Sequence, residues 1–164
     1  MIPQALVATL LATIAQYTGY AIPGTPPDIE QISHRQLEAA YCHRPCNILG
    51  LTTPDGVILL DDKLAIGKDP AATSILVHEL THFLQRANAS RGTPVNCKVW
   101  AERESEAYDV QYRWLREKSP SILSFSQSLS ELGPHLMMLR CAEDSGSLGP
   151  DRRPSFQQPN RVML

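Results

Sequence analysis

Two histidines four residues apart, with a glutamate beside the first, are the residues of this chain best suited to chemistry. They stand in the sequence His78-Glu79-Leu80-Thr81-His82. On a helix, side chains four residues apart share one face, so both imidazoles can bind one metal ion from the same side. A glutamate in the second position can take a proton from a water on the metal without being a ligand. The pattern predicts a Zn²⁺ site with His78 and His82 as ligands and Glu79 as general base.

The residues around this motif predict that it lies on a helix. Asp69 is a favourable N-cap, and Pro70 suits the first helical position. The apolar residues that follow at helical spacing are Ile75, Leu76, Leu80, Phe83 and Leu84. The polar and glycine-containing run from Asn88 to Gly92 ends the pattern, so we expect a helix over about residues 70–89. A capped, apolar helix around the motif favours a metal site over two histidines paired by chance.

A catalytic zinc usually takes a third protein ligand and leaves its fourth position to water. The remaining histidines, which are His34, His43 and His135, have no spacing that points to this site. An amphipathic, acidic helix predicted over residues 100–115 is a better source. Glu104 shares one face of that helix with Tyr108 and Gln111. Glu102 and Glu106, two residues away on either side, point elsewhere.

At these residues the chain resembles the gluzincin metallopeptidases, in which HExxH on one helix is completed by a glutamate on the next. Residues 104–107 (ESEA) match the second part of that pattern, a glutamate followed three residues later by a small residue. HELTH is the form found in the thermolysin-like family, and with Tyr108 and Gln111 the pairing is similar to a set of small bacterial HExxH proteins. The resemblance covers about residues 40–118 and implies a zincin-like fold with Glu104 as the third zinc ligand.

Glu106 is the alternative third ligand, although Glu102 and Glu106 are both expected on a solvated face or around the site. There Glu106 can pair with a neighbouring lysine or arginine. Thermolysin-like enzymes often carry an aspartate four residues after the ligand glutamate, and it orients a zinc histidine. This chain has Tyr108 in that place. The candidates for a donor that stabilises the oxyanion are Tyr108, His43 and His135, and a tyrosine simply packed on the helix face is the alternative for Tyr108.

The expected activity is zinc-dependent hydrolysis of peptide bonds in a peptide or protein substrate. The alternative is a zinc-holding binding or regulatory module with little or no hydrolysis. Glu79 favours the enzyme, because a purely structural site needs no base beside its ligand. A third interpretation, an all-helical domain without metal, requires the histidine pair to be a coincidence.

Composition places the chain among ordinary globular proteins. Its 164 residues are enough for one domain, 20% are charged, and the net charge is −2. No basic stripe is visible, which argues against nucleic acid as a partner. No apolar run reaches the ~18–20 residues of a membrane span. The apolar stretch 5–15 suits the core of a signal peptide or an amphipathic first helix ended by Gly19, and we favour the helix because no Lys or Arg precedes it.

The remaining patterns predict an α+β fold that is mainly helical. Residues 47–51 and 57–61 flank the turn Thr52-Thr53-Pro54-Asp55-Gly56 and indicate a β-hairpin before the HExxH helix. A short helix that starts at Ser33 is expected within residues 32–41, and further helices are expected at 122–132 and 135–140. We expect one zincin-like domain over residues 1–142, followed by a flexible tail at 143–164 that is rich in Ser, Gly, Pro and Arg.

Four cysteines make an even count, which suits two disulfides and an extracytoplasmic enzyme, either periplasmic or secreted. Cys42 and Cys46 can close a tight loop, which leaves Cys97 to pair with Cys141. A second zinc site made of these cysteines and His43 is an alternative, but its spacing is irregular. Reduced, inert thiols are the other alternative.

Overall fold

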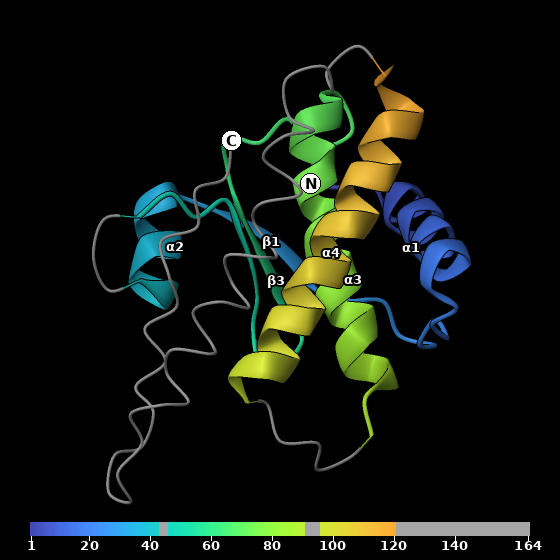
Figure 1. Ribbon diagram of the computed structural model, residues 1–164. Coiled ribbons are helices and arrows are strands. Elements are labelled where there is room, and N and C mark those ends of the chain that lie inside the picture. The colour runs from blue at the N-terminus through green and yellow to red at the C-terminus, as the bar shows by residue number, and fades with distance from the viewer. Residues whose placement is uncertain (43–45, 91–95, 121–164) are drawn as a thin grey trace, which may run out of the picture.

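The computed structural model describes residues 1–42, 46–90 and 96–120, and over these residues it shows helices packed around a three-stranded sheet (Figure 1). The helices are α1 (Gln4–Thr18), α2 (His34–Tyr41), α3 (Pro70–Asn88) and α4 (Cys97–Lys118). The strands are β1 (Ile29–Ile32), β2 (Gly50–Thr52) and β3 (Ile58–Asp61). This part of the chain is therefore a mainly helical α+β domain, as expected. The helices predicted at 122–132 and 135–140 and the tail at 143–164 lie outside the described residues.

Helix α3 begins and ends close to the predicted positions. The Asp69 carboxylate accepts a hydrogen bond of 2.9 Å from the Ala71 N–H, Pro70 takes the first position, and the backbone is extended at Ala89. Helix α4 begins at Cys97, ahead of the expected start, because Asn96 acts as the N-cap and its side chain accepts from the Val99 N–H. Local capping chemistry thus fixes where both helices begin.

The predicted hairpin is present within a sheet that has one more strand. Strands β2 and β3 are antiparallel, with Gly50 opposite Leu60. The sequence did not predict β1, which pairs parallel with β3. Ile32, expected at the start of the following helix, ends β1 instead, and Ser33 caps α2 through a capping box. The strand order β1-β3-β2 places β2 at one edge of the sheet.

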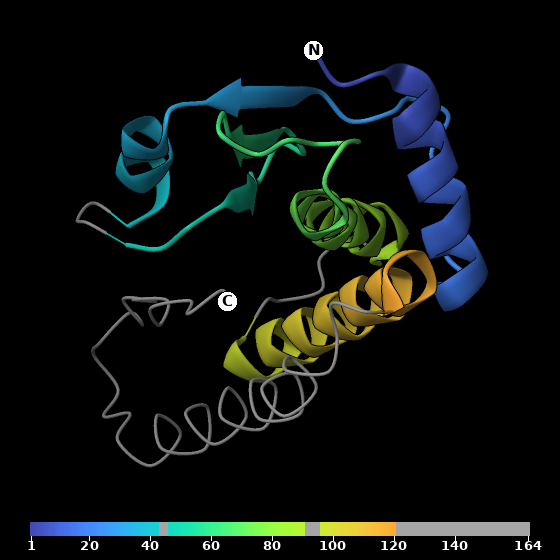
Figure 2. The same cartoon turned by 90° about the horizontal axis from the view of Figure 1, so that it is seen from above.

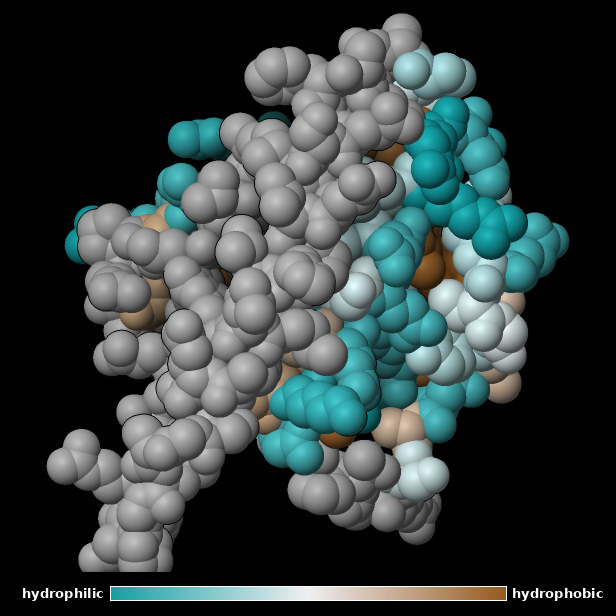
Figure 3. Space-filling view, in the orientation of Figure 1, coloured by the Kyte–Doolittle hydropathy of each residue, from teal (hydrophilic) through white to brown (hydrophobic). Residues whose placement is uncertain are grey.

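Helix α3 lies at the centre of the domain, enclosed by the sheet, α1 and α4 (Figure 2). Helices α3 and α4 run side by side in opposite directions (Figure 1). The core joins α3 to its three neighbours through Leu10 and Ile14 of α1, Ile58 and Leu60 of β3, Leu76, Leu80 and Leu84 of α3, and Val110 and Trp114 of α4. The outward face of α4 is hydrophilic (Figure 3).

Burial along α3 is continuous through the HExxH motif. Every residue from 72 to 81 is buried, including two ionisable side chains, His78 at 0% exposure and Glu79 at 1%. A buried polar group is costly unless it has partners. These two side chains therefore need polar partners, which α4 supplies to His78 and β2 supplies to Glu79.

Candidate metal centre

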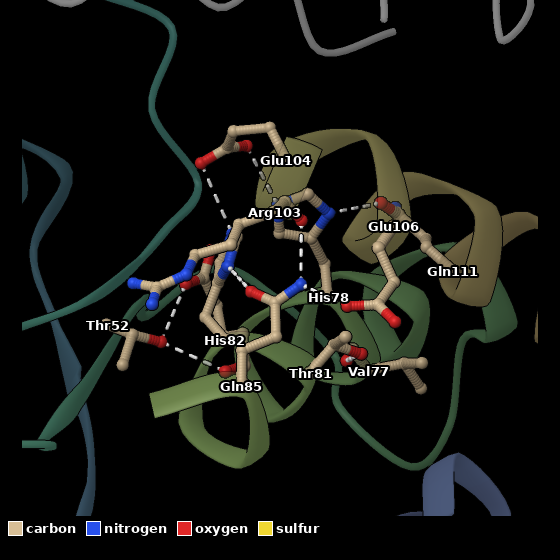
Figure 4. Close-up of polar contacts among 11 residues, drawn as sticks. Thr52, Val77, His78, Thr81, His82, Gln85, Arg103, Glu104, Glu106 and Gln111 are labelled. Atoms are coloured by element: carbon tan, nitrogen blue, oxygen red, sulfur yellow. Dashed lines mark hydrogen bonds and ion pairs between the residues drawn. The ribbon is translucent and has the colours of Figure 1, made fainter. Parts of the chain in front are cut away.

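Three side chains from α3 and α4 meet at one point (Figure 4). The Nε2 atoms of His78 and His82 are 3.1 Å apart. The Glu104 carboxylate places Oε2 3.5 Å from His78 Nε2 and Oε1 3.3 Å from His82 Nε2. His78 and Glu104 are buried, and His82 is partly buried. The structure thus brings together the three residues that were predicted as metal ligands.

The spacing of these donor atoms fits a transition-metal ion. With metal–ligand bonds of about 2.0–2.2 Å in a tetrahedral site, neighbouring ligand atoms lie about 3.3–3.6 Å apart. The observed separations of 3.3 and 3.5 Å fall in that range, and the third, 3.1 Å, is slightly shorter. Two imidazoles and one carboxylate also leave one position for water, as catalytic zinc sites do.

The hydrogen bonds around His78 assign its tautomer. The Ser74 hydroxyl donates to the Ala71 carbonyl at 2.7 Å, so its oxygen accepts from Gln111 Nε2 at 3.1 Å. That orientation points Gln111 Oε1 at His78 Nδ1, 3.1 Å away. Since an amide oxygen only accepts, Nδ1 carries the proton, and in the neutral ring Nε2 carries the lone pair.

His82 is oriented by a separate set of hydrogen bonds. Gln85 Nε2 donates to the Arg103 carbonyl and to Glu106 Oε2, both at 2.8 Å. Its Oε1 therefore faces His82 Nδ1, at 2.9 Å, and accepts from it. His82 Nε2 carries the lone pair for the same reason as in His78.

Two imidazole lone pairs and a carboxylate thus converge on one small volume. Electron-pair donors at these distances repel one another unless a cation lies among them. Outer hydrogen bonds that fix the tautomer and plane of a histidine are a regular feature of metal ligands. Among the described residues, His78, His82 and Glu104 therefore form a donor set arranged to hold a metal ion.

Strand β2 contacts the buried Glu79 side chain. The Thr52 hydroxyl lies 2.9 Å from Glu79 Oε2 and 3.0 Å from the Glu79 carbonyl oxygen, and it can donate to either. Gly50 is packed so closely that an added Cβ would lie 2.9 Å from Glu79 Cγ and Oε1. Glycine at position 50 is therefore required for the carboxylate to lie against the strand.

Strand β2 presents an open edge next to this carboxylate. The Asp61 N–H donates to the Leu49 carbonyl, and the Thr53 N–H donates to the Val57 carbonyl. Because hydrogen-bonded pairs alternate in an antiparallel ladder, the backbone groups of Gly50 and Thr52 point away from β3. Among the described residues no strand pairs with that edge.

Tyr108 contacts the site, as its position on α4 suggested. Its ring centroid lies 4.6 Å from that of His78 at an interplanar angle of 62°, and the ring also stacks on Tyr112 at 6.2 Å. The predicted role of Tyr108 as an oxyanion donor stays a prediction. His43 and His135, the other two candidates, lie outside the described residues. Gln111, three residues further along α4, contacts His78 Nδ1 at 3.1 Å.

The two flanking glutamates take different places. Glu102 is exposed and lies 3.9 Å from Lys98 in an ion pair. Glu106 points to the side of the metal centre, where its Oε2 accepts hydrogen bonds from Gln85 and, at 2.7 Å, from the Tyr20 hydroxyl. The expected pairing of Glu106 with a lysine or arginine is replaced by these two neutral donors.

Sequence reasoning missed the residues that support the ligands rather than bind the metal. Gln85 stands three residues after His82, a spacing that puts both on one helix face, and this signal was available. Gln111 was expected on the same helix face as Glu104 and in a family pattern, but its contact with His78 was not predicted. The roles of Ser74, Thr52 and Gly50 depend on contacts between distant parts of the chain, which local spacing does not reveal.

The cysteines support the predicted pairing as far as the described residues extend. Cys42 and Cys46 form a disulfide, with sulfur atoms 1.99 Å apart. Cys97 is also disulfide-bonded, and Cys141, its predicted partner, lies outside the described residues. No cysteine in the described part of the chain is free.

Comparison with family models, curated proteins and solved structures finds no match to this chain. Within the residues that the structure describes, no helix has the length and apolar character needed to cross a membrane. The functional argument therefore rests on the geometry of the site.

Proposed function

We propose that this chain is a zinc-dependent metallopeptidase of the gluzincin type. His78, His82 and Glu104 would hold the zinc, and Glu79 is the general base. One observation carries the proposal: the residue that follows the ligand His78 is a buried carboxylate, Glu79, which takes no part in the centre of three converging donors. A site that only holds a structural metal has no use for such a base.

The chemistry follows from the residues around the centre. Bound zinc acidifies a coordinated water and polarises a carbonyl group. Glu79 then takes a proton from the attacking water and returns it to the amine that leaves the cleaved peptide bond. The Thr52 hydroxyl, 2.9 Å from Glu79 Oε2, steadies the carboxylate while the proton moves. Tyr108, packed on His78, is our candidate for the donor to the oxyanion.

The open edge of β2 supports a peptide as the substrate. An extended segment can add to a sheet edge through its main chain, and this mode of recognition accepts many sequences. The outward backbone groups of Gly50 and Thr52 belong to the same strand whose other atoms contact Glu79. A segment paired there would lie beside the general base. The Cys42–Cys46 disulfide supports an oxidising compartment outside the cytoplasm as its place of action.

The decisive variant is Glu79→Gln, because it removes the base and keeps a side chain of the same shape. We expect full zinc content, an unchanged fold and a loss of peptide cleavage of about 10²–10⁴-fold. Zinc is measured by elemental analysis, and cleavage by mass spectrometry on a broad peptide library. Wild-type rates in Glu79→Gln would contradict the role of the base. Zinc binding without cleavage by the wild-type chain would favour the binding or regulatory module instead.

A further inference from the structure

We infer that Gln85, Glu106 and Tyr20 form a positioning chain that fixes the orientation of His82 and reaches from the two helices that carry the metal ligands to the segment after α1. The inference rests on the proposed metal centre and concerns residues that do not touch the metal. None of the three would be a catalytic residue, because each acts only through His82.

The first link of this chain is rigid. Gln85 is 5% exposed, and its carboxamide makes hydrogen bonds with three groups: the His82 ring, the Arg103 carbonyl and the Glu106 carboxylate. Both amide protons are used, so the group cannot rotate without losing two bonds. A fixed Oε1 in turn fixes the plane of the His82 ring and its proton on Nδ1 (Figure 4).

The second link brings in a residue far away in the sequence. Tyr20, which follows α1, donates to Glu106 Oε2 at 2.7 Å, the same oxygen that accepts from Gln85. Glu106 is thereby held from two sides. Burial, followed by the hydrogen bond to Glu106, raises the pKa of Tyr20 to about 12, so the phenol keeps its proton and remains a donor at neutral pH.

The segment that carries Tyr20 is itself tied to α3. Ala21 exchanges two hydrogen bonds with the side chain of Asn88, each of 2.9 Å, through its N–H and its carbonyl. Asn88 Nδ2 also lies 2.9 Å from the Leu84 carbonyl. Tyr20 is therefore anchored next to the last turn of α3, the helix that supplies His82. The hydrogen bonds of the positioning chain therefore link α3 to α4, α4 to the segment after α1, and that segment back to α3.

His78 and His82 differ in the charge of the groups that their hydrogen-bond chains reach. The chain behind His78 runs through Gln111 and Ser74 to the Ala71 carbonyl, all neutral groups. The chain behind His82 ends on the Glu106 carboxylate. A carboxylate in this place increases the electron density of a ligand imidazole, here through one intervening amide. Glu106 thus increases the electron density of the His82 imidazole through Gln85, as a directly bonded carboxylate does in other metal sites.

The test compares two tyrosines that each donate to a glutamate of α4, one in the positioning chain and one away from it. Tyr17 also donates to a glutamate of α4, Glu117, and burial raises its pKa to about 12 as well, but Glu117 has no contact with a metal ligand in the described residues. Apo protein is titrated with Zn²⁺ against a chromogenic chelator, and the visible spectrum of the Co²⁺ form is recorded. We expect Tyr20→Phe to weaken zinc binding severalfold and Gln85→Met about tenfold or more, both with altered Co²⁺ bands. Tyr17→Phe should match the wild type in both readings.

A charge-swapped pair keeps the test valid if Gln85→Met does not fold. Gln85→Glu alone places two carboxylates together, and Glu106→Gln alone removes the charge, so each should weaken zinc binding. The double variant restores the donor and acceptor between positions 85 and 106 and should recover most of the affinity. Equal zinc affinity in Tyr20→Phe and Tyr17→Phe, or no recovery in the double variant, would overturn the inference alone. A wild-type chain that binds no zinc would overturn the metal centre with it.

Discussion

Two histidine clusters in this domain are alike at one ring nitrogen and differ at the other. His34 Nδ1 lies 2.7 Å from the Asp61 carboxylate, much as His78 and His82 use Nδ1 to contact glutamine side chains. The Nε2 of His34 lies 3.1 Å from the Cys46 carbonyl oxygen and 3.5 Å from a Glu38 carboxylate oxygen. The Nε2 atoms of the other two differ in that they also face each other, 3.1 Å apart, beside the Glu104 carboxylate.

This difference separates a structural histidine from a ligand. Both nitrogens of His34 are used within the protein, so the ring ties α2 to the end of β3 and to the residue that closes the disulfide loop. His78 and His82 use one nitrogen to fix the ring and direct the other at a shared point. The partner of Nε2, rather than burial or residue type, therefore tells the two kinds apart.

The largest difference is expected when one histidine of each kind is replaced by alanine and the two variants are compared. His78→Ala should abolish zinc binding, because it removes a ligand. His34→Ala should leave the zinc content unchanged and lower the free energy of unfolding by about 1–3 kcal/mol, because buried Asp61 loses a hydrogen bond. Elemental analysis and urea unfolding measure the two quantities. If His34→Ala lost its zinc as fully as His78→Ala, the distinction drawn from Nε2 would be wrong.

A smaller contrast is expected between two glutamates of α4. Glu104→Gln should lose most of the zinc affinity, because the variant replaces an anionic ligand by a neutral amide. Glu106→Gln should keep the metal but bind it about tenfold more weakly, since only the support of His82 changes. Chelator competition gives both constants. The reverse order of the two effects would move the third ligand to Glu106.

The smallest effect on the metal is expected in the cluster of His34. Replacing Cys42 and Cys46 by serine should lower the free energy of unfolding by about 2 kcal/mol or less, because the loop is short, and should leave zinc affinity as it is.

Breaking the disulfide of Cys97, which begins α4, should lower both the free energy of unfolding and the zinc affinity. Non-reducing peptide mapping should find Cys42 joined to Cys46 and Cys97 to Cys141. A Cys42–Cys97 linkage would contradict the pairing.

Local signals made much of this structure predictable. Asp69 and Pro70 mark the start of α3, and the turn at 52–56 marks the hairpin. Helical spacing, together with the resemblance to gluzincins, favours Glu104 over the alternative Glu106. These features depend on residues close together in the sequence, where capping, turn chemistry and periodicity act.

The parts that escaped prediction depend on distant contacts. Strand β1 has four residues with no clear alternation of buried positions, and it exists because it pairs in parallel with β3. The hydrogen bond between Tyr20 and Glu106 joins residues 86 positions apart. Gly50 could pass for an ordinary turn-forming glycine until the position of Glu79 is known. Packing between helices and strands, which sequence spacing does not encode, decides each of these.

The open edge of β2 also has a consequence for the solubility of the protein. Unpaired strand edges recruit strands from other molecules, including further copies of the same chain, and this is a common route to aggregation. Here the edge is three residues long, and a proline, Pro54, follows within two residues of its end. A short edge ended by a residue that lacks an N–H cannot support a long intermolecular ladder. The brevity of β2 thus limits self-association through this edge.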